Sequence, residues 1–220
     1  KSEDPIFVTK NGYGAALLSD PEHAKKLMYT LKENLKEETN LSLKIRIGFG
    51  GNRNPIFFAK LAEELKLSHI TIHGRTREQM YTGFADWTVI RDMKEAVSIP
   101  VIGNGDIFTA QDAIDKITLS GVDGVMLARG IFGNPWLIGQ IKDAFEGREV
   151  REVSQEDRVD LALKHINYLK EDREDREFCY EIRKHLCWYI KGMKHASRIK
   201  DEINKTDNYD RLYEIMSTLK

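Results

Sequence analysis

Four short apolar runs, each followed by a polar loop and a helix-like segment, dominate the first two thirds of the chain. They are Leu41–Ile47, His69–His73, Ile99–Gly103 and Val122–Leu127. In the first run apolar and polar positions alternate, so Lys44 and Arg46 fall on the face opposite the leucines and isoleucines. Strands that alternate with helices at this spacing predict a parallel sheet joined by right-handed crossovers.

Helix signals accompany each of these runs. Apolar periodicity predicts helices over Asp20–Lys36, Pro55–Leu65, Asp86–Val97 and Ala110–Leu119. The last of these has clear boundaries, because Thr109 is a good N-cap, Asp112 lies in the first turn and Gly121 ends the pattern. A further helix is expected to start near Asn134.

The order of elements predicts an α/β fold of the (β/α)8 TIM-barrel type, with only the C-terminal half of the barrel present. An open, doubly wound four-stranded sheet is the competing architecture. The barrel is favoured because His73, Asn104 and Arg129 all lie in or just after strands. A barrel gathers the carboxyl ends of its strands around one mouth, where such residues would meet.

The pattern changes after Ala144. Gly147–Ser154 is a polar linker, and the remainder has helical periodicity without a strand signal. Ser154 and Asp157 resemble a capping box, and helices are predicted over residues 155–171, 174–191 and 208–218. Residues 1–146 are therefore assigned to the half barrel and residues 147–220 to an all-α domain.

Two consecutive strand ends carry loops suited to phosphate. Asn104-Gly105-Asp106 and Ala128-Arg129-Gly130 offer backbone N–H groups and one guanidinium next to helix N-termini. The alternative is that these glycines only close tight turns between strand and helix.

Ile182–Lys200 contains six lysines or arginines and no acid. Treated as one helix, it places Ile182, Leu186, Tyr189 and Met193 on a core face. Lys184, Trp188, Lys191, His195 and Arg198 would share the opposite face. A basic stripe with an exposed aromatic is typical of nucleic-acid binding, although a solvated charged face gives the same pattern. Gly192 is a point where the helix could bend or end.

Composition narrows the possibilities only slightly. The formal net charge is −1, so a nucleic-acid surface must be a local patch. No apolar run is long enough to span a bilayer, the first residues do not resemble a signal peptide, and a cytoplasmic protein is expected. Cys179 and Cys187 lack metal-ligand spacing, so no metal site is predicted and structural thiols are expected.

Several motifs together resemble the tRNA-dihydrouridine synthase family. The motifs are His73–Arg77, Tyr81–Gly83, Ala85–Trp87, Pro100–Ile107, Gly124–Met126, Arg129-Gly130, Gly133–Trp136, Lys10–Leu18, Lys44–Arg46, Arg183–His185, Trp188-Tyr189 and Lys191-Gly192. Each motif is weak alone, but the joint pattern is specific and covers the chain from about Val8.

The resemblance implies a flavin barrel followed by a helical tRNA-binding domain. It implies FMN-dependent reduction of tRNA uridine to 5,6-dihydrouridine with NADPH as reductant. The flavin-binding residues implied are Lys44, His73, Asn104, Gly105, Asp106, Ala128 and Arg129, with Ala128 where the family often has glycine. Arg46 would lie near the target uridine with Tyr81 beside it. The helical pattern of the basic segment, rather than the resemblance, selects Lys184, Lys191 and Arg198 as the residues expected to bind tRNA. For His73 alone, a hydrogen-bonded core histidine is an equally good interpretation.

One feature departs from the family pattern. The family's cysteine general acid belongs to a Gly-Cys-Pro motif that should precede the Lys10 segment, where this chain reads Ser2-Glu-Asp-Pro5. No catalytic residue is therefore assigned, and the chain is expected to be a truncated or separately supplied part of a synthase. A half barrel would pair with its missing half or form a homodimer.

Two other functions remain open at this point. A tRNA-binding remnant could keep the helical domain without the chemistry. Another flavin barrel, such as a dihydroorotate dehydrogenase-like enzyme, could act on a small molecule, although the basic segment Ile182–Lys200 disfavours it.

Overall fold

The computed structural model describes residues 12–52, 54–171 and 175–220. The expectations made for Lys1–Pro5 and for Val8–Asn11 lie outside these residues. The chain divides into two compact units, one ending at Ala128 and one beginning at Arg129. The domain boundary expected between residues 146 and 147 stays a prediction, and the two units are described separately.

The first unit is built on one four-stranded parallel sheet. Its strands are β1 Ser42–Arg46, β2 His69–His73, β3 Val101–Asn104 and β4 Gly124–Met126. The order is β1-β2-β3-β4, with every neighbouring pair parallel. All four predicted strands are confirmed, with shorter bounds at their ends.

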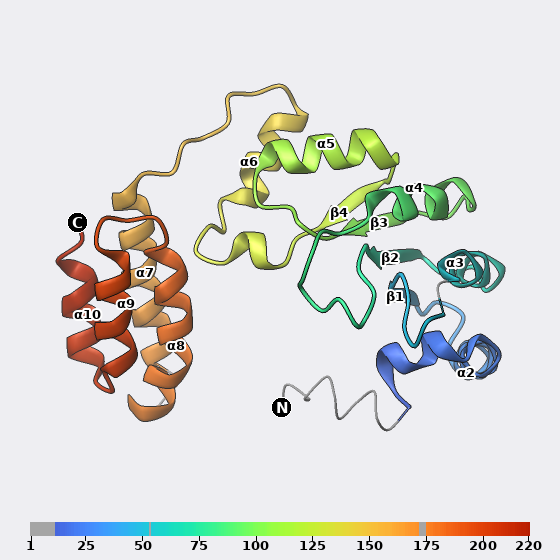
Figure 1. Cartoon of the computed structure of the whole chain (residues 1–220), viewed down its shortest axis with the longest axis horizontal. Helices are drawn as coiled ribbons and strands as arrows, with labels where there is room; N and C mark the ends of the chain where they lie inside the picture. Colours follow the sequence, from blue (N-terminus) through green and yellow to red (C-terminus); the bar gives the residue numbers. More distant parts are fainter. Residues whose placement is uncertain (1–11, 53, 172–174) are drawn as a thin grey trace. The chain divides into compact units, whose positions relative to one another are not determined.

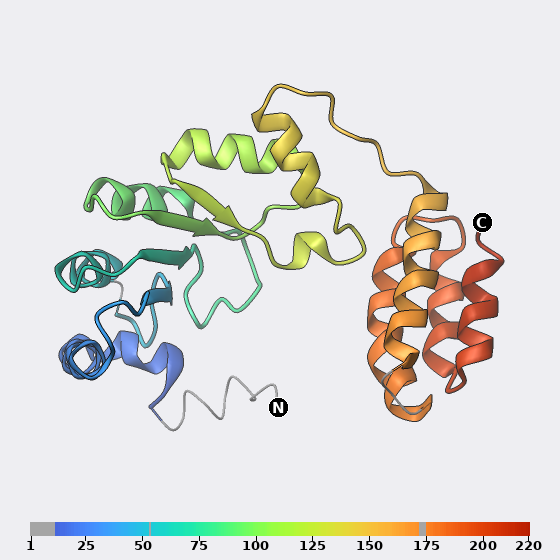
Figure 2. The ribbon, with the colours of Figure 1, turned by 180° about the vertical axis from the view of Figure 1, so that it is seen from behind.

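This strand order distinguishes the two architectures that the sequence left open. A doubly wound sheet reverses its strand order at a switch point, which sends helices to both faces. Here the order never reverses, so right-handed crossovers bring successive helices to one face. Figures 1 and 2 show α3, α4 and α5 following one another along the same side of the strands. The arrangement therefore favours the barrel type over the doubly wound sheet.

Local capping explains where the helices of this unit begin. They are the 3-10 helix η1 Gly14–Ser19 and the α-helices α2 Pro21–Asn34, α3 Pro55–Glu64, α4 Trp87–Glu95 and α5 Ala110–Ser120. The predicted capping of α5 is confirmed: Thr109 and Asp112 form a reciprocal capping box, and Gly121 ends the helix at φ 65°. Each predicted helix of this unit is present.

The helix-covered face of the sheet is apolar and closely packed. Ile45, Ile72, Gly103 and Val125 are register neighbours on this face. A Cβ placed on Gly103 would lie 2.3 Å from the ring of Trp87, which is the first residue of α4 and is buried. Gly103 is therefore needed to seat the indole against β3.

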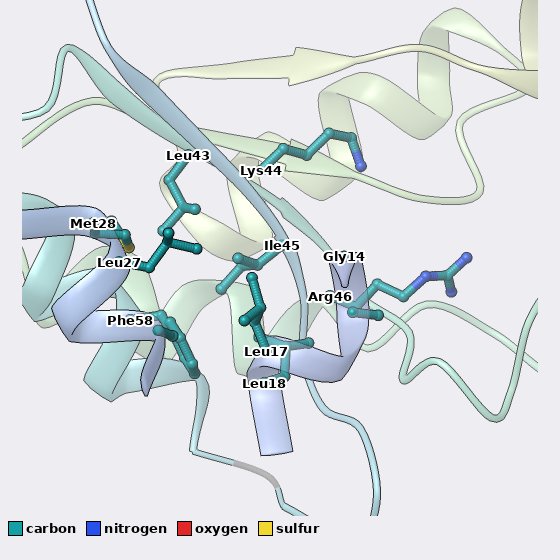
Figure 3. Close-up of a pocket in the computed structure, with 12 residues that line it drawn as sticks. Gly14, Leu17, Leu18, Leu27, Met28, Leu43, Lys44, Ile45, Arg46 and Phe58 are labelled. Carbon is teal, nitrogen blue, oxygen red and sulfur yellow. The ribbon is translucent and has the colours of Figure 1, made fainter. Parts of the chain in front are cut away.

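The two edge strands of the sheet are β1 and β4. Among the described residues β1 pairs only with β2, and β4 pairs only with β3. Next to β1 lies an apolar cavity of about 400 Å³, shown in Figure 3. Leu17, Leu18, Leu27, Met28 and Phe58 line it together with β1. Residues of η1, α2 and α3 thus face the apolar side of β1 and leave this cavity between them.

The second unit is helical in its described residues. Its elements are the 3-10 helix η2 Arg129–Ile131 and the α-helices α6 Leu137–Phe145, α7 Gln155–Glu171, α8 Asp175–Tyr189, α9 Ala196–Lys205 and α10 Tyr209–Ser217. The predicted capping box before α7 is confirmed, because Asp157 N donates to Ser154 Oγ and Ser154 N donates to Asp157 Oδ2, both at 3.0 Å. The α7–α10 helices share one buried apolar core.

The helix predicted over residues 174–191 is confirmed as α8, and Gly192 lies in the break that follows it, but the single helical face assigned to Ile182–Lys200 is wrong. The α8 helix ends at Tyr189, and α9 begins at Ala196. Gly192 has a φ of 84° and His195 a φ of 60°, both left-handed values that a continuing α-helix excludes. Lys191 and Arg198 therefore do not share a helical face with Lys184. The predicted core positions Ile182, Leu186, Tyr189 and Met193 are all buried, as expected.

In the described ranges, no helix is both long and apolar enough to cross a membrane.

The packing of Trp87 leads to a stability prediction. Gly103→Ala should lower the free energy of unfolding by about 1–3 kcal/mol, because the added methyl group overlaps the indole. Gly139→Ala is the matched control: Gly139 lies within α6 with open space around its Cβ position, so alanine should be neutral or slightly stabilising. Urea unfolding of both variants measures this, and an undiminished stability of Gly103→Ala would contradict the packing argument.

Candidate functional site

The polar face of the sheet brings four predicted site residues together. Arg46, His73 and Asn104 are register partners across β1, β2 and β3 at the carboxyl ends of the strands. Residues paired in parallel register project on the same face, and Lys44 lies two positions earlier on that face of β1. Figure 3 shows Lys44 and Arg46 extending away from the apolar side chains of the cavity. The strand ends thus carry a polar, cationic row.

Two basic side chains on β1 define one end of this row. Partial burial lowers the pKa of Lys44, and the positive charge of Arg46 lowers it further. Arg46 donates from Nη1 to the carbonyl oxygens of Thr76 at 3.0 Å and Met80 at 3.2 Å. Arg46 therefore also holds the loop that carries the exposed Tyr81.

His73 is buried within this cationic surrounding. Its burial, followed by the charges of Arg46, Lys44 and Arg75, lowers its pKa to about 4, while Asp106 acts in the opposite direction. The imidazole is therefore neutral at pH 7. A neutral imidazole can donate one hydrogen bond and accept another without adding a further cation to the site.

The loop after β3 is held by hydrogen bonds to its neighbours. Asn104 Nδ2 donates to Met126 O at 2.7 Å, which joins β3 to β4. The indole N–H of Trp87 donates to Gly105 O at 3.1 Å. A Cβ on Gly105, whose φ is 132°, would lie 2.5 Å from Ala85 Cβ, so only glycine fits at this position.

Asp106 has a different environment from the one expected for a phosphate ligand. Its Oδ2 accepts from Arg75 Nη2 at 2.8 Å and from the backbone N–H of Ala85 at 2.7 Å. A carboxylate engaged in this way joins the β3–α5 loop to the β2–α4 loop. Direct contact of Asp106 with a phosphate stays a prediction, and like charge disfavours it.

Arg75 is a functional candidate that the sequence pattern did not single out. It is only 1% exposed, and its Nε and Nη2 donate to the carbonyl oxygens of Thr82 at 3.2 Å and Gly83 at 2.7 Å. Its Nη1 is buried and has no hydrogen-bond partner among the described residues. The available signal was an arginine two residues after a strand-end histidine, with an aspartate after the next strand. Unpartnered buried donors are uncommon and invite a ligand or a water.

The remaining predicted cofactor residues lie at the division between the units. Ala128 is the last residue of the first unit and Arg129 the first of the second. Arg129 begins η2 and interacts with other groups of the protein. The role of both residues at a phosphate stays a prediction.

The predicted RNA-binding cations of the second unit are all exposed, and two of them lie over aromatic rings. Lys184 Nζ is 4.9 Å from the ring centroid of Tyr180, and Lys191 Nζ is 5.6 Å from that of Trp188. Phe132 packs 5.6 Å from Trp188 between ring centroids. Arg198 lies on α9. Two of the three predicted cations thus lie beside an exposed aromatic ring, and Arg198 lies on a different helix from Lys184.

The part of the chain that the structure describes contains no group of three histidine, cysteine, aspartate or glutamate residues arranged to hold a metal ion. Cys179 and Cys187 are free thiols on α8, and burial raises the pKa of both.

Parallel α/β sheets bind ligands at the carboxyl ends of their strands, where this sheet carries Arg46, the neutral His73 and Asn104. The family model described as "Dihydrouridine synthase (Dus)" matches residues 6–218. The chain belongs to the dihydrouridine synthase family.

Curated relatives agree with this assignment. The chain is 37% identical over 203 residues to a probable tRNA-dihydrouridine synthase of Rickettsia conorii. The aligned region covers 91% of the chain and 61% of the relative. It is 34% identical over 219 residues to probable tRNA-dihydrouridine synthase 1 of Synechocystis, and the aligned region covers 97% of the chain and 61% of the relative. It is 35% identical over 208 residues to tRNA-dihydrouridine synthase B of Pasteurella multocida, and the aligned region covers 93% of the chain and 62% of the relative. The chain thus spans about six tenths of the length of these relatives.

The environment of His73 gives a prediction for its titration. Because the folded pKa of about 4 lies below the ordinary value of 6.5, the unfolded chain binds more protons between these values. The contribution of His73 to stability should be complete above about pH 6.5 and fall as the pH drops towards 4. Lys44→Met should raise the pKa of His73 by removing a nearby cation. Lys142→Met, which removes an exposed lysine of α6, is the control.

NMR titration of the histidine side chains measures the pKa of His73 in the unaltered chain and in Lys44→Met. Urea unfolding as a function of pH measures the contribution of His73 to stability. A His73 that titrates at its ordinary value in the folded chain would contradict the described environment, as would an unchanged pKa in Lys44→Met.

Proposed function

We propose that this chain is part of a tRNA-dihydrouridine synthase, which uses FMN and NADPH to reduce uridine to 5,6-dihydrouridine in tRNA. The main support is the family match over residues 6–218, which includes the residues of the cationic strand-end row. The names of the relatives supply the tRNA substrate and the reaction. The cytoplasm is the proposed location because tRNA is the substrate.

The residues at the strand ends fit an anionic flavin. Lys44 and Arg46 supply positive charge, His73 is neutral, and Arg75 has a buried N–H group without a partner in the part of the chain that the structure describes. In this proposal Lys44 and His73 lie at the ring system, while Asn104, Gly105, Ala128 and Arg129 surround the phosphate. When bound, FMN supplies hydride transfer. Lys44 offsets negative charge that develops on the ring, and His73 orients it through a hydrogen bond.

Asp106 and Arg46 have more specific roles in this proposal. Asp106 acts through Arg75, fixing the loop around the cofactor rather than touching the phosphate. Arg46 directs its guanidinium towards the uracil and simultaneously fixes the loop that carries Tyr81. Each residue thus positions a loop as well as contributing charge.

The architecture proposed is half of a (β/α)8 barrel over residues 1–146 and a helical tRNA-binding domain over residues 147–220. Two observations support this architecture. The strands β1 and β4 are edge strands of the described sheet, and an apolar cavity lies beside β1. A closed barrel leaves no strand edge, so further strands are needed, from the other half of the barrel or from a second copy of the chain.

A catalytically incomplete tRNA-binding protein is the second candidate. Both cysteines of the chain, Cys179 and Cys187, lie on α8 in the helical unit, away from the strand ends of the first unit in sequence. Neither corresponds to the cysteine general acid that the family resemblance implies. A protein of this kind would bind tRNA but would lack the proton transfer to the uracil ring.

Flavin binding separates the two candidates. FMN titrated into the purified chain should show a perturbed flavin absorbance spectrum. Lys44→Met should weaken binding about tenfold, as expected when one charge-assisted hydrogen bond worth about 1.4 kcal/mol is removed. Lys142→Met should bind as the unaltered chain does. If excess FMN leaves its free spectrum unchanged, the flavin site is absent from this chain and the second candidate is favoured.

The RNA-binding surface has its own test. Changing Lys184, Lys191 and Arg198 together to alanine should weaken tRNA binding and reduce the slope of log K against log salt by up to about 2–3, near 0.9 for each phosphate that is no longer neutralised. The control changes Lys164, Lys205 and Lys220 to alanine and removes the same charge elsewhere on the helical unit. An unchanged affinity in the first variant, or an equal loss in the control, would refute a specific surface.

A further inference from the structure

The β2–α4 loop presents unusually exposed large side chains. Phe84 is 86% exposed, Tyr81 57% and Met80 44%, and all three lie within five residues. Single exposed apolar residues are common on protein surfaces and carry little meaning alone. Phe84 differs from these because of how its backbone is held.

The peptide groups on both sides of Phe84 are bound by one ion pair. Arg75 Nη2 donates to Gly83 O at 2.7 Å and to Asp106 Oδ2 at 2.8 Å. The same Asp106 Oδ2 accepts from the N–H of Ala85 at 2.7 Å. The residues immediately before and after Phe84 are thus bound to the same two side chains, and Phe84 itself extends into solvent.

This ion pair is buried, with Arg75 and Asp106 side chains 2% and 15% exposed. Removing two charges from water is unfavourable unless their geometry and additional hydrogen bonds compensate. Here the additional bonds go to Thr82, Gly83 and Ala85, so the compensation comes from the loop that carries Phe84. The Arg75–Asp106 pair therefore fixes the loop in one conformation.

The surroundings of the loop indicate the chemistry of its partner. Arg46 donates to Met80 O and interacts electrostatically with Tyr81, Arg75 and Arg77. An exposed aromatic ring on a positively charged edge suits an unpaired nucleobase, whose phosphates meet the cations while the base stacks on the ring.

We propose that Phe84 is a substrate-binding residue, held in advance by the Arg75–Asp106 pair as a stacking platform for an unpaired base of the RNA substrate. Arg75 and Asp106 are positioning residues that act through Phe84. The identity of the RNA as tRNA rests on the proposed function. A base that stacks on a fixed ring loses less conformational entropy in the complex than one that must order a mobile loop.

The test compares Phe84→Ala, Phe84→Trp and Phe145→Ala in the full chain, with unmodified tRNA transcripts as the probe. Phe145 is 49% exposed at the end of α6 and is the matched control for loss of an exposed phenyl ring. Phe84→Ala should bind tRNA about 5- to 100-fold more weakly, Phe84→Trp should bind as the unaltered chain does, and Phe145→Ala should have no effect. The salt dependence of binding should not change in Phe84→Ala, because stacking releases no counterions.

Two failures are distinguishable. If the unaltered chain binds tRNA and Phe84→Ala binds it equally, the stacking role is overturned while the proposed function stands. If the unaltered chain does not bind tRNA, the proposed function fails and the RNA role of Phe84 fails with it.

The positioning role is tested by a double-mutant cycle. Asp106→Asn and Arg75→Lys should each weaken tRNA binding, and combining either with Phe84→Ala should cause no further loss, because both act through the same ring. Amide hydrogen exchange should increase at residues 82–86 in both single variants. Additive losses, or unchanged exchange at these amides, would show that the pair is structural only.

Discussion

A buried ion pair between Arg75 and Asp106 joins the two loops from which the candidate site is built. Arg75 follows β2, Asp106 follows β3, and their contact at 2.8 Å is surrounded by hydrogen bonds to the β2–α4 loop. Breaking one partner would leave the other buried and unpaired, which is commonly costlier than the net value of the pair. The conformation of the loop segment from Thr82 to Ala85, which carries Phe84, depends on this contact.

The parallel register gives the ion pair its functional context. It places Arg46, His73 and Asn104 in one row at the carboxyl ends of β1, β2 and β3. Burial, followed by the cations of this row, lowers the pKa of His73, so the imidazole is neutral and adds no positive charge to the row. Strand register and electrostatics therefore act together to set a neutral imidazole within a row of cations.

Much of this organisation could be predicted from the sequence, because it follows from local patterns. The alternation in Leu41–Ile47 predicted the strand and the polar face of Lys44 and Arg46, and Thr109 and Asp112 predicted a cap that the structure contains. The break after Tyr189 could be predicted only in part, since Gly192 marks a possible end of the helix but the left-handed His195 has no sequence signature. Arg75 and the surroundings of Phe84 were missed because they depend on contacts between loops about 20 to 30 residues apart.

The proposed function requires that the strand ends form a flavin site. The most direct measurement is a ¹H–¹⁵N NMR titration of the isotopically labelled chain with FMN. The largest shift changes should occur at the backbone amides of Lys44, His73 and Asn104–Asp106. Saturation of the titration with no change at these amides, or with changes confined to the helices of the second unit, would contradict it.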